Sequence, residues 1–179
     1  LLPNPFFLFF FPPPKNTNIF FWLLLPLNNL FPKQNTTKKI KFFYHENLIQ
    51  YAGYTSLNPY TIRNKLIGLN ETDNGQYDLP KKTAYAHGAG MMVKREIIDK
   101  VGLMPEVYFL YYEEIDWSER IKAHGYDIYF IPQSVILHKE SVSTGKSSPL
   151  KSYYFVRNRI IFTRRNMKGL RKFSSLLFQ

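Results

Sequence analysis

The sequence predicts an α/β domain, and two observations support that prediction. Between residues 38 and 145, short apolar segments follow one another in the order strand, helix, helix, strand, with short connections. The same stretch has the charge balance of an ordinary globular domain, because its 13 basic and 13 acidic side chains cancel. The chain of 179 residues carries a formal net charge of +11, so the whole basic excess lies outside this stretch.

Composition divides the chain into three parts. Residues 1–37 use only nine amino-acid types and contain no acid, and we interpret them as a disordered or non-native segment, as a truncated or frame-shifted reading would produce. Prolines separate its two apolar runs, each too short to span a bilayer, and a membrane-associated hairpin is the alternative. Residues 38–145 form the globular part. Residues 146–179 carry nine basic side chains and no acid, which predicts a basic amphipathic helical tail.

The expected strands are marked by apolar and aromatic residues between turn signals. The run 39–44 has high β-propensity, and 53–80 is rich in Asn, Pro and Gly, which indicates a long loop or a loose hairpin. Small residues followed by apolar ones over 85–93 predict a buried strand that another backbone or a ligand approaches closely at Gly88 and Gly90. Alternating apolar positions predict two further strands over 127–132 and 134–138.

The expected helices are marked by helical spacing and by terminal glycines. We predict one helix over 94–101 ending before Gly102, and a second over 113–124 ending before Gly125. A third helix is predicted over 149–165, with Leu150 and Tyr153 on its apolar side.

Three carboxylates, Glu113, Glu114 and Asp116, cluster at the predicted start of the second helix. Acids in a first turn complement the helix dipole and need no chemistry. Flanking aromatic residues, among them Trp117, would partly desolvate these acids and raise a carboxylate pKa into the range of a general base. Both interpretations stay open at this point.

Other sites are sparsely marked in the sequence. The chain contains no cysteine, which excludes disulfide scaffolds, thiolate metal sites and cysteine nucleophiles. His138 ends a predicted strand, and with remote carboxylates it would complete a Mg²⁺ or Mn²⁺ site, although a lone histidine is more often a packed residue. Serine-hydrolase, Walker, Rossmann and zincin motifs are missing from the sequence.

Taken together, the motifs resemble the C-terminal half of bacterial family 2 glycosyltransferases of the rhamnosyltransferase-like group. They occur in register as GAG before an apolar strand, KRE before a helix ending in VG, YFLYYEEIDW, GYDIYFIP, LHK, STG and YYFVRNR. The resemblance covers about residues 38–166. It implies a partial GT-A fold, the nucleotide-diphospho-sugar transferase fold, without most of its nucleotide-binding half.

The resemblance implies an inverting transfer of a sugar from a nucleotide-sugar donor to a hydroxyl acceptor in cell-surface polysaccharide or glycan synthesis. Glu114 matches the position of the base that deprotonates the acceptor hydroxyl, with Asp116 as second choice and Glu113 beside them. His138 matches a histidine that helps to hold a divalent Mg²⁺ or Mn²⁺ ion.

The resemblance also implies a set of substrate-binding residues. The wall approached by the acceptor or the sugar would comprise Tyr85, His87, Gly88, Gly90 and Trp117. On the last predicted helix, the guanidinium groups of Arg157 and Arg159 would reach a phosphate.

The sequence departs from the family pattern in the region that would bind the donor. The family carries an Asp-x-Asp metal motif upstream of this region, and the chain contains no Asp-x-Asp sequence. We therefore expect a fragment that is inactive or impaired by itself.

The basic tail suggests alternatives to catalysis. Basic residues interleaved with aromatic ones favour contact with an anionic membrane surface, or else a solvated helix face. A non-catalytic membrane- or nucleic-acid-binding module is the alternative function, but the neutral middle offers no second basic patch, so no nucleic-acid partner is expected. The expected location is cytoplasmic, with peripheral contact to the inner face of the plasma membrane.

Overall fold

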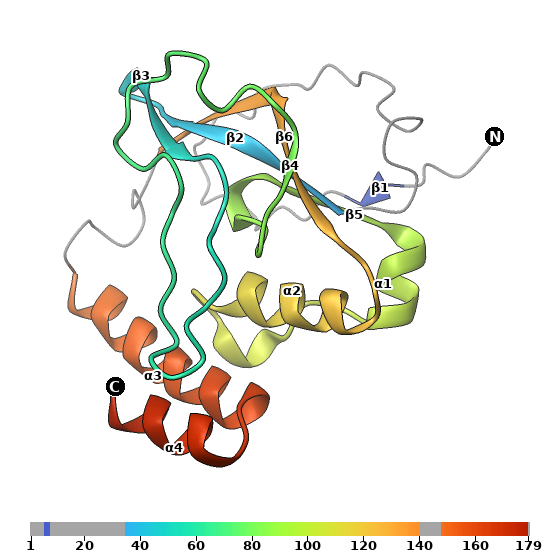
Figure 1. Ribbon diagram of the computed structural model, residues 1–179, viewed down its shortest axis with the longest axis vertical. Coiled ribbons are helices and arrows are strands. Elements are labelled where there is room, and N and C mark those ends of the chain that lie inside the picture. The colour runs from blue at the N-terminus through green and yellow to red at the C-terminus, as the bar shows by residue number, and fades with distance from the viewer. Residues whose placement is uncertain (1–5, 8–34, 140–147, 179) are drawn as a thin grey trace.

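The computed structural model describes residues 6–7, 35–139 and 148–178, and it confirms a mixed α/β architecture. A curved sheet lies at one side of the molecule and the helices at the other (Figure 1). The described strands are β1 (Phe6–Phe7), β2 (Asn35–Phe42), β3 (His45–Tyr51), β4 (Lys81–Lys82), β5 (Met91–Lys94) and β6 (Ile128–His138). The described helices are α1 (Arg95–Val101), α2 (Glu113–Ala123), α3 (Pro149–Asn166) and α4 (Gly169–Leu177), with 3₁₀ turns η2 (Gly88–Gly90) and η3 (Glu106–Tyr108).

Strand β2 is the centre of the sheet. The strand order is β1-β5-β2-β6-β4, and β3 pairs with β2 outside this path. The β2–β6 pair is parallel, whereas β2 pairs with β3 and β5 in the antiparallel sense. Central placement explains why Thr37 and Ile40 of β2 are fully buried.

Strand β2 differs from the predicted strand over 39–44. It begins at Asn35, which pairs with Ile128 of β6, and it ends at Phe42, where a turn leads into β3. The boundary expected between residues 37 and 38 therefore falls within a strand, because backbone pairing with β6 includes residues of unremarkable β-propensity. Apart from 6–7 and 35–37, the segment interpreted as disordered or non-native lies outside the described residues.

Strand β6 is one continuous element, so the prediction of two strands over 127–132 and 134–138 was wrong. Its register against β2 shifts between Ile131 and Val135, which pair with Lys38 and Lys39. Pro132 lies at this irregularity, where its missing N–H removes no regular ladder bond. The proline that we interpreted as a boundary between two strands therefore marks a bulge inside one strand.

The region 85–93 is strand only from Met91 onwards. Gly88–Gly90 form η2 instead, and a Cβ atom on Gly90 would lie 2.7 Å from Ile136 Cδ1. At Gly90 the close neighbour is therefore a side chain and not the expected backbone or ligand, and at Gly88 no protein atom lies within 4 Å of the position of a Cβ atom. The backbone around Gly88 is accordingly open.

The stretch 53–80 is confirmed as a loose hairpin. Isolated bridges join Tyr54 to Leu66 and Asn58 to Arg63. The hairpin extends away from the sheet towards α3 and α4 (Figure 1), where Ser174 Oγ of α4 donates to Tyr60 O at 3.4 Å. This loop therefore links the sheet to the C-terminal helices.

The predicted helices are confirmed with small shifts at their ends. Gly102 ends α1 with φ 83° and donates its N–H to Ile98 O at 2.8 Å. Helix α2 ends one residue early, at Ala123, and α3 ends one residue late. The predicted apolar side of α3 was wrong at Leu150 and Tyr153, which are at least half exposed, whereas Ile161 packs against a core cluster.

Helix α3 packs through Asn158, Phe162 and Thr163, which are fully buried. Among the described residues, no helix combines the length and the hydropathy needed to cross a bilayer.

Helix α2 is held on two sides, which fixes the position of its first turn. Trp117 and Ile121 pack with α1 and β5 in one apolar cluster. Ile115 packs with Ile62 of the hairpin and Phe162 of α3 in a second cluster.

Candidate functional site

The loop that leads into α2 has an unusual backbone. Phe109, Tyr111 and Tyr112 have φ values of 63°, 66° and 75°, although bulky residues disfavour positive φ. Each such residue costs about 1–3 kcal/mol and persists only where the surroundings enforce it. The chain therefore turns sharply into α2 and places Glu113 and Glu114 in its first turn.

Asn158 of α3 enforces this loop conformation. Its buried side-chain Nδ2 lies 2.9 Å from Tyr108 O, 2.5 Å from Leu110 O and 2.9 Å from Tyr111 O. Arg157 Nη1 in turn donates to Asn158 Oδ1 at 2.7 Å and fixes the orientation of the amide. Sequence reasoning missed Asn158, although it stands in the YYFVRNR segment used for the resemblance.

Glu113 and Glu114 form a pair of largely buried carboxylates in the first turn of α2. The Oε2 atoms of both residues are buried and have no hydrogen-bond partner among the described residues. Desolvation by burial, followed by the neighbouring charge of Glu113, raises the pKa of Glu114 to about 8. Burial also raises the pKa of Glu113. A carboxyl group in this state is poised to exchange a proton near neutral pH.

Asp116 differs from its neighbours, although it lies on the same turn. Its Oδ2 accepts from Tyr108 Oη at 2.6 Å and from Arg165 Nε at 2.9 Å. The side chain is 1 % exposed, so it anchors α3 to α2 and does not face a substrate. We therefore correct its choice as second candidate base: Asp116 is a structural ion-pair partner.

A cluster of aromatic rings and histidines lies between the acid pair and the end of β6. Tyr54 stacks on His87 at 6.2 Å between ring centroids with an interplanar angle of 7°, and Tyr51 meets His87 edge-on at 5.1 Å. Burial is the main cause of the raised pKa of the Tyr51 and Tyr54 phenols, and the negative charge of Glu114 raises both pKa values further. The structure thus brings Glu114 and His87 into one neighbourhood.

The two histidines of this cluster are neighbours. The His87 and His138 rings are 6.1 Å apart, and His138 Nδ1 lies 2.9 Å from Gln50 Oε1. Burial, and then the proximity of His138, lowers the pKa of His87 to about 3, so His87 is neutral at physiological pH. Its Nδ1 accepts from Ala89 N at 3.1 Å, which fixes the ring against η2.

The described residues do not complete a metal site. No group of three or more acidic, histidine or cysteine side chains in 35–139 and 148–178 is arranged to hold a metal ion. His138 Nδ1 lies 2.9 Å from Gln50 Oε1, and its ring is 6.1 Å from that of His87. The expected Mg²⁺ or Mn²⁺ ion, which would prefer carboxylate oxygens, stays a prediction.

Two of the expected wall residues are buried in the protein core. Trp117 is fully buried and donates its Nε1–H to Gly102 O at 2.9 Å, so we correct its assignment to a substrate wall. Tyr85 is 1 % exposed and donates to Glu119 Oε1 at 2.5 Å. Its side chain borders a cavity of about 500 Å³ whose lining includes neither the acid pair nor the two histidines. Tyr85 supports the cluster from behind instead, because its carbonyl accepts from Tyr51 Oη at 2.9 Å.

The two arginines expected to reach a phosphate have different surroundings. Arg157 Nη1 is directed at Val107 O, 3.2 Å away, and at Asn158, so it stabilises the loop before α2. Burial raises the pKa of Tyr112 to about 12, and the positive charges of Arg159 and Arg63 partly oppose this increase. Arg63 comes from the hairpin over 53–80, and a long ordered loop is a signal of function that could have pointed to it.

Comparison with known proteins adds a relationship at the level of sequence. The chain is 30% identical over 95 residues to dTDP-rhamnosyl transferase RfbF of Shigella flexneri, which covers 49% of this chain and 32% of that protein. It is 29% identical over 66 residues to an N-acetylglucosaminyl-diphospho-decaprenol L-rhamnosyltransferase of Mycobacterium tuberculosis, covering 37% of this chain and 22% of the relative. It is 29% identical over 96 residues to the low-salt glycan biosynthesis hexosyltransferase Agl10 of Haloferax volcanii, covering 53% of this chain and 31% of the relative.

These matches show a family 2 glycosyltransferase-like relationship over about half of the chain. The chain spans about a third or less of the length of these curated relatives. No protein-family profile matches it.

Proposed function

We propose that this chain carries the acceptor side of an inverting glycosyltransferase, with Glu114 as the general base. The observation that supports this proposal most directly is the buried Glu113–Glu114 pair, whose Oε2 atoms have no hydrogen-bond partner among the described residues and which lies in a region of glycosyltransferase-like sequence. A partial GT-A fold belongs to the same proposal. The mixed sheet with α2 beneath it is compatible with that fold.

In the proposed reaction, an acceptor hydroxyl approaches Glu114 from the open side near Gly88. Its oxygen forms a bond to the anomeric carbon of the donor sugar, while the bond from that carbon to the diphosphate breaks. The hydroxyl proton moves to the Glu114 carboxylate, and the electron pair leaves with the nucleoside diphosphate. A carboxylate with a pKa near 8 is a stronger base than an ordinary one, which favours this proton transfer.

The surrounding side chains have proposed supporting roles. Tyr51, Tyr54 and neutral His87 form a rigid aromatic surface that excludes water from the carboxylate and keeps its pKa raised. Arg159 and Arg63 supply positive charge on the Tyr112 side of the site, where negative charge on a leaving diphosphate would be stabilised.

The donor side of the reaction is not provided by the described residues. We derive no step through a metal ion, because no group of three or more acidic, histidine or cysteine side chains among the described residues is arranged to hold one. The expected Mg²⁺ or Mn²⁺ stays a prediction from the resemblance. Because the sequence has no Asp-x-Asp, we also propose that the chain by itself binds a nucleotide sugar weakly and turns it over slowly or not at all.

The substrates are proposed from the relatives. A dTDP-linked sugar as donor and a glycan or lipid-linked sugar as acceptor fit the names of the rhamnosyltransferases that the chain resembles. The tail is not proposed as a separate nucleic-acid module.

The first experiment tests the base without requiring turnover. Carboxyl groups of the full chain, labelled with ¹³C-glutamate, are titrated by NMR in the wild type and in Glu114→Gln. We expect one signal with an apparent pKa near 8 that disappears in the variant, and we expect an acceptor sugar to move that pKa. An ordinary pKa at Glu114 would contradict the proposed role.

The second experiment measures transfer. The full chain is incubated with dTDP-rhamnose, Mn²⁺ and an N-acetylglucosaminyl-diphospho-lipid, and release of dTDP is followed. Where turnover is detectable, we expect Glu114→Gln to lower it by about 100-fold or more. Asp99→Asn is the matched control, because Asp99 lies on α1 in an exposed pair with Arg95. Equal turnover in both variants would remove Glu114 from the mechanism, and rapid transfer by the wild type would refute the expected impairment.

A further inference from the structure

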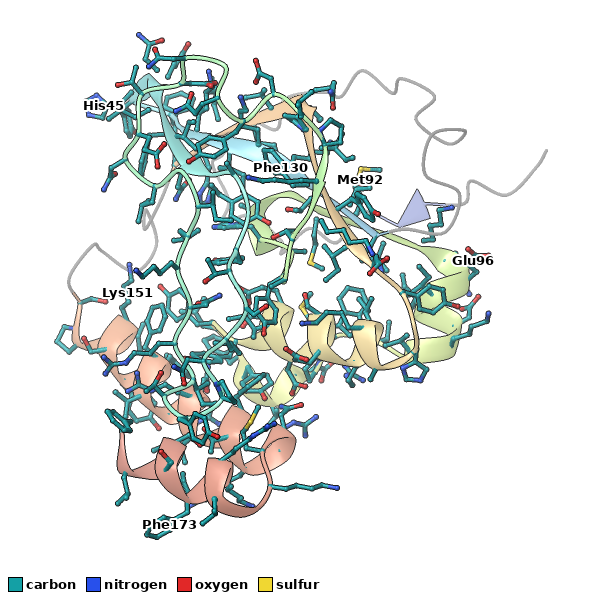
Figure 2. All side chains as sticks on the ribbon, in the orientation of Figure 1. His45, Met92, Glu96, Phe130, Lys151 and Phe173 are labelled. Carbon is teal, nitrogen blue, oxygen red and sulfur yellow. The ribbon has the colours of Figure 1, made fainter. Side chains whose placement is uncertain are left out.

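Helix α4 has its amphipathic character reversed relative to a helix that packs on a protein core. Three apolar side chains one turn apart, Leu170, Phe173 and Leu177, are 84 %, 66 % and 72 % exposed. The opposite side, with the fully buried Ser175, faces the protein. Phe173 projects from the outer margin of the molecule, away from α3 (Figure 2). A helix stabilised only by its own protein would place these sides the other way round.

Polar contacts help to attach α4 to the rest of the chain. Ser174 Oγ donates to Tyr60 O of the hairpin at 3.4 Å, and Lys172 Nζ donates to Arg164 O at 3.4 Å. The orientation of α4 is therefore set by its polar side, which leaves the apolar stripe of Leu170, Phe173 and Leu177 facing outwards.

The charge around this stripe indicates which partner covers it. Residues 164–172 contain five basic side chains, and the whole segment 146–179 has no acid. At 100° per residue, Arg171 and Lys172 lie behind the stripe on either side of α4, and the exposed side chain of Arg171 is long enough to extend past the helix toward a charged surface. An outward apolar stripe on a segment that carries only basic charge matches a surface that is apolar below a layer of negative charge, which is the structure of an anionic lipid bilayer.

We propose that α4 lies in the interface of an anionic membrane, with Leu170, Phe173 and Leu177 inserted between the lipids and with the exposed Arg171 at the phosphate level. This inference rests on the exposure and charge of α4 and not on the proposed transferase activity. It predicts a molecule that contacts the membrane edgewise through its C-terminal end, with the sheet farthest away (Figure 1).

Vesicle binding of the full chain tests the proposal. We expect sedimentation with vesicles of phosphatidylcholine and phosphatidylglycerol, and little with phosphatidylcholine alone. The triple variant Leu170→Ser, Phe173→Ser, Leu177→Ser should bind anionic vesicles about tenfold or more weakly, whereas Leu79→Ser with Leu103→Ser should bind as the wild type does. Leu79 and Leu103 are the matched control, because they are 81 % and 63 % exposed and lie far from α4 in the sequence. The Phe- and Leu-rich residues 1–34 are the same in all variants, so the difference reports on α4.

Insertion itself has a separate readout. In Phe173→Trp, tryptophan emission corrected for the wild type should shift to the blue on adding anionic vesicles, and in Leu79→Trp it should not. Three results would overturn the proposal: equal vesicle binding by the triple variant, a concentration-dependent dimer that the triple variant abolishes, or binding to an oligonucleotide without binding to vesicles.

Discussion

Two groups of carboxylates in this molecule have opposite electrostatic surroundings. Asp73 and Asp78 face Lys39, whose Nζ lies 3.0 Å from Asp73 Oδ1 and 2.5 Å from Asp78 Oδ1, and Lys41 Nζ lies 2.7 Å from Asp73 Oδ2. In contrast, the Oε2 atoms of Glu113 and Glu114 are buried and have no hydrogen-bond partner among the described residues.

The pKa values respond accordingly. Burial by itself would raise the pKa of Asp73, but hydrogen bonds from Lys41 and Lys39 outweigh it and hold that pKa below its ordinary value. At Glu114, burial and Glu113 act in the same direction and raise the pKa. Neighbouring cations, rather than the number of acids, therefore distinguish a structural cluster from a reactive one.

The first way to test this contrast is to release the loop that holds the acid pair. Asn158→Ala removes the buried amide from three carbonyl oxygens and leaves a strained loop without its support. We expect a loss of about 3 kcal/mol in the free energy of unfolding, measured by urea denaturation, and a fall in the pKa of Glu114 as water enters.

Asn166→Ala is the matched control for this change. Asn166 lies at the end of the same helix and makes a single bond, to Phe162 O at 3.1 Å. Its replacement should cost about 1 kcal/mol and leave the pKa of Glu114 unchanged. Equal effects of the two variants would mean that Asn158 does not position the acids.

The second test removes the charge of Glu114. Its folded pKa of about 8 exceeds the ordinary value of 4.5, so the folded state binds the proton more tightly than the unfolded state. Stability should therefore fall as the pH rises from 4.5 to 8 and then level off. Glu114→Gln should remove that slope and raise the free energy of unfolding by roughly 2 kcal/mol at pH 9.

Glu96→Gln provides the comparison. Glu96 occupies the first turn of α1, as Glu114 does in α2, but it is exposed. Thermal unfolding followed across pH should show a slope unaffected by that substitution. A wild-type protein whose stability does not decrease between pH 4.5 and 8 would contradict the raised pKa.

The third prediction, with the smallest expected effect, concerns Asp73, which forms ion pairs with Lys39 and Lys41. The lowered pKa of Asp73 means that its contribution to stability is present above the ordinary value of 3.8 and is lost as the pH falls through the folded pKa. Asp73→Asn should cost about 1 kcal/mol at pH 7 and close to nothing in strong acid. Chemical denaturation at both pH values measures this, and Asp99→Asn, in an exposed pair, should change little at either.

Local sequence signals predicted much of the fold and part of the site. Helical spacing and terminal glycines located α1, α2 and α3 to within one residue at most ends, and the cluster of acids marked the start of α2. The acids could be recognised from the sequence because three carboxylates within four residues form a local pattern, whatever their partners in the fold. The bulged strand β6 was wrongly predicted as two strands, because a proline inside a strand has the same sequence pattern as a proline between two strands.

The sequence by itself determined the candidate side chains, namely the acids of α2, the histidines His87 and His138, and the basic surplus of the C-terminal segment. Only the tertiary structure decided which of them are buried and which are paired. Arg165, 49 positions away from Asp116, pairs with that acid, whereas burial raises the pKa of Glu114. Asn158, about as distant in the sequence, fixes the loop before the acids, and the polar side of α4 directs its apolar side outwards. These outcomes depend on contacts between distant segments, because burial and pairing, which set a pKa or an exposed face, are properties of the packed chain and not of a local pattern.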